Sequence, residues 1–192
     1  MNGHLPYNEI SSMLNCGSSV GNKVSDSGAI FLGHMPEVAP KAYLHVIYPP
    51  IDEKSILELN EILKPAILHS SLIDFFRFAN GMNLFFKKGF RVFGYVPAEK
   101  RVSEGFFDYP DDILHANGDI RIKGSESNEI TIGWYLADSS YVNLDECGRV
   151  VRFNPSNPKK IIQCWPDIKS WLISEIERLN NDFSHVTSQN NN

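Results

Sequence analysis

Three runs of β-branched and aromatic residues follow one another in the second half of the chain, and polar turns separate them. The turns contain Asp, Ser, Glu, Cys and Gly residues. Short apolar runs bounded by such clusters are typical of antiparallel strands. The pattern therefore predicts a three-stranded meander with strands Ile130–Tyr135, Tyr141–Leu144 and Arg149–Phe153.

Helical spacing predicts a different structure before the meander. A helix is expected to begin near Asp52 or Ser55, because Ser55 and Glu58 match a capping box. A second helix is expected to begin at Pro65 and end at Asn80-Gly81, since proline is tolerated in a first turn and glycine suits a helix end. Its apolar face consists of Leu68, Leu72, Phe75, Phe76 and Ala79.

Shorter signals complete the series of elements. Asp167 is a candidate N-cap for a C-terminal amphipathic helix that is expected to run to Leu179. A helical turn is expected at Ile113–Ala116. Further short strands are predicted at Tyr43–Tyr48, Asn83–Phe86, Phe90–Val96, Asp119–Lys123 and Ile161–Cys164.

Helices, then consecutive strands, then a closing helix predict a single α+β domain. We expect a twisted, mainly antiparallel sheet with N-terminal helices and a C-terminal helix packed around it. Regular βαβ alternation is absent from the sequence, which argues against a dinucleotide-binding arrangement. The domain is expected to cover residues 41–183, with a poorly defined segment at 1–40 and a disordered polar tail at 184–192.

Composition narrows the class of protein without identifying it. The 192-residue chain is 42% hydrophobic and 21% charged, as is ordinary for a soluble globular protein. Its net charge of -5 argues against nucleic-acid binding and favours a basic partner. The sequence shows no apolar run of membrane-spanning length and no signal peptide. Three cysteines without a C-x-x-C pair indicate reduced thiols, so we expect a cytoplasmic protein without disulfides, structural zinc or another cofactor.

The motifs that suggest catalysis lack the context that they require. Ser19 lies at the centre of a G-x-S-x-G sequence, but no hydrophobic strand is predicted before it and no helix after it. The neighbouring Gly21-Asn22-Lys23 does not have the spacing of a phosphate loop. The six histidines show no metal-ligand spacing. We therefore expect a non-catalytic protein with no metal site.

The best surface candidate is the loop Gly105–Asp112, in which aromatic residues lie among carboxylates. Aromatic side chains supply rigid contact area and carboxylates steer a basic partner, so the loop predicts a protein interface. In a second interpretation Phe106 and Phe107 are buried in the core, and the sequence leaves both open. Together with the acidic turns of the meander, the candidate partner-binding residues are Phe107, Asp108, Tyr109, Asp111, Asp112, Asp138, Asp145 and Glu146.

Three segments of the chain form a recognisable series. The first is an amphipathic helix ending in Asn-Gly, Ser70–Met82, followed by a strand, a turn and Phe90–Pro97. The second is the meander from Ile130 to Phe153, with its YVNLD strand, and the third is the terminal helix Ile168–Leu179, which carries a Trp-Leu pair. In this order and spacing the segments resemble the SUKH superfamily, which includes the fungal Smi/Knr cell-wall synthesis regulators and many bacterial immunity proteins.

The resemblance implies an α+β fold and a role in binding, without catalytic residues. Bacterial members of the superfamily look like antitoxins that neutralise a cognate polymorphic toxin, often a nuclease or deaminase, and fungal members act as adaptors. The first hypothesis is therefore a cytoplasmic immunity protein that occludes the active site of a basic toxin domain. The alternative is a regulatory adaptor in cell-wall synthesis or signalling that binds an endogenous protein.

Overall fold

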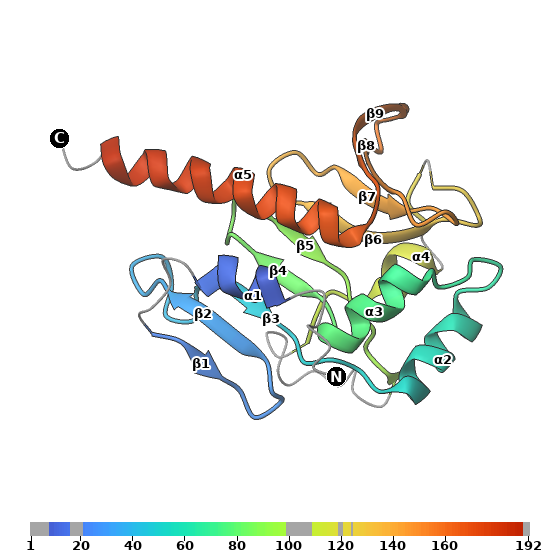
Figure 1. The fold of residues 1–192 in the computed structure, drawn as a ribbon, viewed down its shortest axis with the longest axis horizontal. Coiled ribbons are helices and arrows are strands. Elements are labelled where there is room, and N and C mark those ends of the chain that lie inside the picture. Colours follow the sequence, from blue (N-terminus) through green and yellow to red (C-terminus); the bar gives the residue numbers. More distant parts are fainter. Residues whose placement is uncertain (1–7, 16–20, 99–108, 119–120, 124, 190–192) are drawn as a thin grey trace.

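A computed structural model describes residues 8–15, 21–98, 109–118, 121–123 and 125–189. Within these residues, nine strands form one sheet in which each strand pairs antiparallel with the next along the chain (Figure 1). The sheet and its helices confirm the predicted single α+β domain. The strands are β1 (Lys23–Val24), β2 (Ile30–His34), β3 (Tyr43–Ile47), β4 (Met82–Leu84), β5 (Phe90–Val92), β6 (Ile130–Tyr135), β7 (Tyr141–Leu144), β8 (Val150–Asn154) and β9 (Asn157–Trp165).

Helices α1, α3 and α5 lie on one face of this sheet (Figure 1). The indole of Trp171 on α5 is fully buried, its ring centroid lies 5.3 Å from that of Phe90, and its Nε1 donates to Tyr135 Oη at 2.9 Å. A Cβ on Gly133 would collide with the backbone oxygen of Arg91 and lie 3.2 Å from Trp171, so close helix–sheet packing requires glycine there. The helices are α1 (Asn8–Asn15), α2 (Glu53–Ile62), α3 (Ser70–Phe78), α4 (Ile113–Asn117) and α5 (Ile168–Gln189).

Helix α2 begins at the first of its two predicted starts, whereas the predicted start of α3 is wrong, and the caps give the reason. Helix α2 begins after Asp52, whose carboxylate accepts from the Ser55 N–H at 2.8 Å, so Ser55 is not the cap. Helix α3 begins at Ser70 instead of Pro65, because the extended backbone of His69 and its Nδ1, which accepts from the Ser71 N–H at 3.2 Å, form the N-cap. The predicted apolar face of this helix is nevertheless buried.

The described residues toward both ends of the chain contain more secondary structure than the sequence predicted. Residues 1–40, for which no element was predicted, include α1, β1 and β2. Asp167 accepts from the Ser170 N–H at 2.7 Å, as expected of the cap of α5, but the helix continues to Gln189, past the predicted start of the tail at Ser184. Residues 121–123 of the predicted strand Asp119–Lys123 are not in a strand. The predicted turn at Ile113–Ala116 is helix α4.

The face of the sheet opposite α1, α3 and α5, here called the outer face, carries a line of side chains. Strand alternation separates them from the core: Asn83 lies between buried Met82 and Leu84, and Arg91 lies between Phe90 and Val92. Pairing register aligns one residue from each of six adjacent strands. This outer-face row consists of Phe31, Val46, Asn83, Arg91, Trp134 and Tyr141.

Candidate functional site

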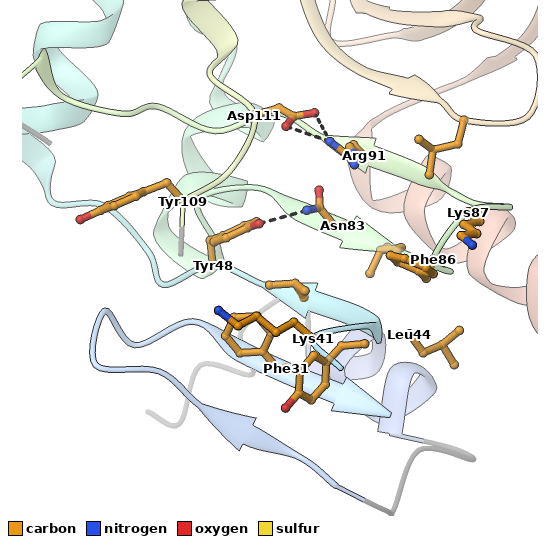
Figure 2. A pocket seen from close by; sticks show the side chains of 14 residues that line it. Phe31, Lys41, Leu44, Tyr48, Asn83, Phe86, Lys87, Arg91, Tyr109 and Asp111 are labelled. Atoms are coloured by element: carbon orange, nitrogen blue, oxygen red, sulfur yellow. Dashed lines mark hydrogen bonds and ion pairs between the residues drawn. The ribbon is translucent and has the colours of Figure 1, made fainter. Parts of the chain in front are cut away.

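A pocket of about 260 Å³ lies on the outer face over β2, β3, β4 and β5, where the segment containing Tyr109 and Asp111 approaches the strands (Figure 2). We call it the outer-face pocket. Its floor includes the first four residues of the outer-face row. The aromatic residues that line it are Phe31, Tyr43, Tyr48, Phe86 and Tyr109.

The aromatic wall is a packed feature of its own. The rings of Phe31 and Tyr43 lie 5.0 Å apart in a tilted arrangement. Phe31 and Tyr48 are buried together with Ala29 in a small cluster separate from the main core. Aromatic pairs at such separations stabilise one another beyond their buried area. The wall is therefore held in place before any ligand arrives.

Asn83 and Tyr48 fix the polar floor of the pocket. The Asn83 Nδ2 donates to Tyr48 Oη at 3.0 Å (Figure 2). The Asn83 Oδ1 is buried and makes no hydrogen bond to any described residue. A buried acceptor without a partner costs about 1–3 kcal/mol. This atom is the feature of the pocket that internal packing leaves unsatisfied.

An ion pair closes the side of the pocket nearest β5. Arg91 donates to both carboxylate oxygens of Asp111 at 3.0 and 2.9 Å, and the guanidinium carbon lies 5.7 Å from the Trp134 ring centroid. Trp134 Nε1 also donates to Asp111, at 3.3 Å. Because both members of the pair are about one-third exposed, its stabilising contribution is modest. Its clearer consequence is that Arg91 and Asp111 are held in a fixed orientation.

The electrostatic character of the pocket is opposite to that of the whole chain. Lys41, Lys87 and Arg91 line it, against the single carboxylate of Asp111, whereas the chain has a net charge of -5. Lys41 and Lys87 are exposed, and Lys87 Nζ lies 5.6 Å from the Phe86 ring centroid. The arrangement offers apolar contact together with attraction for anionic groups.

The structure brings two of the predicted partner-binding residues, Tyr109 and Asp111, to this pocket. Phe107 and Asp108 lie outside the described residues, as do Phe106 and Ser19. Asp112 is the N-cap of α4 and accepts from the Leu114 N–H at 3.0 Å. The surface role predicted for this loop therefore rests on its last residues alone.

The acidic turns of the meander lie at opposite ends of β7, so they do not form one patch with each other. Burial works to raise the pKa of Asp138, but hydrogen bonds from Ser140 and Arg152 outweigh it and lower the pKa. The other turn holds Asp145 and Glu146. Burial opposes ionisation of Asp145 too, yet its pKa is lowered because it accepts from the backbone and the side chain of Arg149.

Glu146, next to Asp145, is exposed and accepts from Asn128 Nδ2 at 3.4 Å. Glu146 and Asp138 are thus exposed, whereas the Asp145 side chain is only 13% exposed. Each of the two aspartates pairs with an arginine of the same chain. The role of these acidic residues in partner binding stays a prediction. The charge that they offer to a partner is partly compensated within the protein itself.

Sequence reasoning missed most of the pocket. Phe31 and Lys41 lie in or next to the segment for which no element was predicted. Asn83 and Arg91 carried a usable signal, since each is a polar position between two apolar ones within a predicted strand. Whether Asn83 and Arg91 lie beside Phe31 depends on the order of the strands in the sheet. The alternation of polar and apolar residues along a strand does not indicate that order.

The pocket presents aromatic rings, two exposed lysines and the Arg91–Asp111 pair, which are groups that can bind a ligand. No Ser, Cys or His is among the residues that line the pocket. Among the described residues, no group of three or more His, Cys, Asp or Glu side chains could hold a metal ion. His45 is a buried residue of β3, and burial lowers its pKa to about 4. Its Nδ1 accepts from the Phe85 N–H at 3.3 Å, so the neutral ring has a structural partner.

No family model, curated protein or solved structure matches the chain. The resemblance to the SUKH superfamily therefore stays a prediction from the sequence. In the part of the chain that the structure describes, every helix is too short or too polar to cross a bilayer.

Proposed function

We propose that this protein is a non-catalytic protein-binding module whose contact surface is the outer face of the sheet. The observation that carries the proposal is the outer-face pocket, with its aromatic wall and its fixed Arg91–Asp111 pair. Aromatic residues and arginine are enriched at protein interfaces and dominate their binding energy. The volume of about 260 Å³ lies below the range of about 300–1,000 Å³ typical of small-molecule sites. A partner's inserted side chain is a better match for this size.

The rigidity of the pocket supports the same proposal. Tyr48 holds the Asn83 amide, and Asp111 holds the Arg91 guanidinium while accepting from Trp134. Side chains that are already ordered lose little conformational entropy when a partner docks, so more of the contact energy appears as affinity. The outer-face row extends these contacts over six strands, which provides area around the pocket for a larger interface.

We further propose, on the basis of the SUKH resemblance, that the partner is a toxin and that this protein is its immunity protein. Binding would neutralise the toxin by covering its active site. The acidic residues Asp138, Asp145 and Glu146 would accelerate encounter with a basic toxin surface, an effect that falls with rising salt. The adaptor function differs only in the partner, which would then be an endogenous protein of cell-wall synthesis or signalling.

The proposal is tested by affinity capture from the native host at low and high salt, followed by mass spectrometry. Three baits are compared with the unmodified chain: Tyr109→Ala and Phe86→Ala in the pocket, and Leu57→Ala as a control. Leu57 is a 67% exposed apolar residue on α2, outside the pocket. We expect the pocket variants to lose the partner and the control to retain it.

The identity of the captured protein separates the two functions. A toxin domain supports the immunity function, and a cell-wall protein supports the adaptor. A partner that all three variants retain would contradict binding through the outer face. A partner that is chemically converted by the protein would contradict the non-catalytic part of the proposal.

A further inference from the structure

We infer that the outer-face pocket binds an acidic peptide segment of the partner, with an aromatic side chain inserted against the pocket's rings and flanking carboxylates on Lys41 and Lys87. The inference deepens the proposed function and rests on it, because it names the chemistry of the partner segment. It follows from three observations: the uncompensated cations, the aromatic wall and the small volume of the pocket.

The two lysines are the cations that remain available in the pocket. Arg91 is neutralised by Asp111, whereas no carboxylate among the described residues pairs with Lys41 or Lys87. They come from different parts of the chain: Lys41 lies two residues before the start of β3, and Lys87 lies in the turn between β4 and β5 (Figure 2). Carboxylates on both sides of an inserted residue could therefore each meet a cation, while a basic segment would be repelled.

The aromatic wall determines what enters between the two cations. Phe31, Tyr43 and Phe86 present ring surfaces to the pocket, and Phe86 is 36% exposed. Aromatic side chains gain more than buried area from such neighbours, because offset and edge-to-face contacts add about 0.5–1.5 kcal/mol per pair. Lys87 Nζ lies 5.6 Å from the Phe86 ring centroid, so a partner that covers this exposed ring also meets the lysine.

Single-stranded nucleic acid is the competing ligand, since it too combines anionic groups with rings that stack. The charge balance argues against it. A strand of phosphates needs a continuous track of cations, and the pocket supplies two available lysines within a chain of net charge -5. Two carboxylates beside one aromatic residue match the two available lysines.

The inference also gives the protein a means of selection. The chain as a whole has a net charge of -5, whereas the pocket is locally positive. A partner with an acidic aromatic segment within a basic surface is complementary at both places. A uniformly basic or uniformly acidic protein is repelled at one of them. The expected basic toxin and the acidic anchor are therefore compatible features of one partner.

The test uses three capped synthetic pentapeptides and the full chain. The probes are Asp-Glu-Phe-Glu-Asp, the same peptide with Ala in place of Phe, and Lys-Lys-Phe-Lys-Lys, with an oligothymidylate as the nucleic-acid probe. Binding is followed by ¹H–¹⁵N NMR at about 0.15 M salt, where the Debye length is about 8 Å. We expect the acidic aromatic peptide to shift the amide signals of the outer-face strands, the Ala peptide to bind at least about fivefold more weakly, and the other two probes not to bind.

Charge reversal in one turn supplies a matched pair of variants. Lys87 and Lys88 are adjacent and both exposed, but only Lys87 lines the pocket. Lys87→Glu and Lys41→Glu should each weaken the acidic aromatic peptide about fivefold or more, because each replaces an attraction by a repulsion. Lys88→Glu should change the affinity by less than about twofold, since its charge lies outside the pocket.

Each unfavourable result is decisive. No binding of the acidic aromatic peptide, equal effects of Lys87→Glu and Lys88→Glu, or preferred binding of the basic peptide or the oligonucleotide overturns the inference. If the captured partner depends on Tyr109 and Phe86 but not on Lys41 or Lys87, the inference fails and the proposed function stands. If the peptide binds as expected while capture of the partner is insensitive to the pocket, the proposed function fails.

Discussion

His45 should make the stability of this protein sensitive to mildly acidic pH. The side chain is 2% exposed, and its ring packs edge-on against Phe85 with a centroid separation of 4.6 Å. Its Nδ1 accepts from the Phe85 N–H, which requires the ring to be unprotonated at that atom. Burial lowers the pKa of His45 from 6.5 to about 4 in the folded protein. The unfolded chain therefore binds a proton at a pH where the folded protein does not.

The sign and the size of the effect follow from this difference. Above the unfolded pKa of 6.5 both states are neutral at His45 and stability is at its full value. As the pH falls through 6.5, the unfolded state gains a proton and stability decreases until the folded pKa of about 4 is reached. At about 1.4 kcal/mol per pKa unit the full loss is about 3 kcal/mol, of which about 2 kcal/mol has occurred by about pH 5.

Urea denaturation at about pH 7.5 and about pH 5 measures this loss, with His45→Asn and His115→Asn as variants. Asn at position 45 keeps an acceptor without a titrating ring, so its stability should be lower at neutral pH but nearly independent of pH in this window. His115 is exposed on α4, and His115→Asn should keep the pH dependence of the unmodified protein. The reasoning is refuted if His45→Asn retains the full loss, or if the unmodified protein loses less than about 0.5 kcal/mol.

Three other substitutions test features of the fold by the same denaturation measurement at neutral pH. Asp52→Ala should cost about 1 kcal/mol because it removes the cap of α2, whereas Ser55→Ala should cost less than about 0.5 kcal/mol; the reverse order would restore the capping-box prediction. Trp171→Ala should cost about 3–5 kcal/mol, since it empties the site between α5 and the sheet; a loss below about 1 kcal/mol would contradict that packing. Arg91→Met should cost about 1 kcal/mol by leaving Asp111 without its cation, and adding Asp111→Asn should recover part of the loss; no recovery would show that the pair is not coupled.

The meander shows what the sequence determines by itself. The structure confirms Ile130–Tyr135 and Tyr141–Leu144 with the bounds that the sequence predicted. Both signals are local, because the alternation lies within each strand and the turn residues lie directly between them. The carboxylate of Asp138, for example, accepts from the N–H and the Oγ of Ser140 within the turn. No information from distant parts of the chain was needed for this unit.

Helix α3 shows where a local signal fails. Leu68 has helical spacing with Leu72 and both are buried, which suggested one helix that begins at Pro65. In the structure Leu68 lies before the helix, and its N–H donates to Asn60 Oδ1 at 2.9 Å. A buried residue in a turn thus reproduced the periodicity of a helix face. Only the contact with α2, eight residues away in sequence, distinguishes the two cases.

The pocket is a property of strand order, and this explains why it could not be predicted. Phe31, Asn83 and Arg91 belong to strands β2, β4 and β5, which the sequence places up to 60 positions apart. Alternation indicates which face of its own strand each residue occupies, but not which strand lies beside it. Residues near chain position 30 lie in no predicted element, so the sequence could not indicate this wall of the site.

The charged residues show the same limit of prediction from sequence. Their pairing in the structure changes what a net charge of -5 means for function. In the sequence, the aspartates in the turns predict an acidic surface. In the structure, Asp145 accepts from the N–H groups of Cys147 and Arg149 and so stabilises the turn itself. Carboxylates that accept hydrogen bonds from the backbone and from arginines of the same chain contribute less to the electrostatic field that a partner meets. Lys41 and Lys87 form no ion pair with a described carboxylate, so their charge is not compensated in this way. The sign of the potential at a site therefore follows from which charges remain unpaired there, and for this protein the outer-face pocket is positive within an acidic chain.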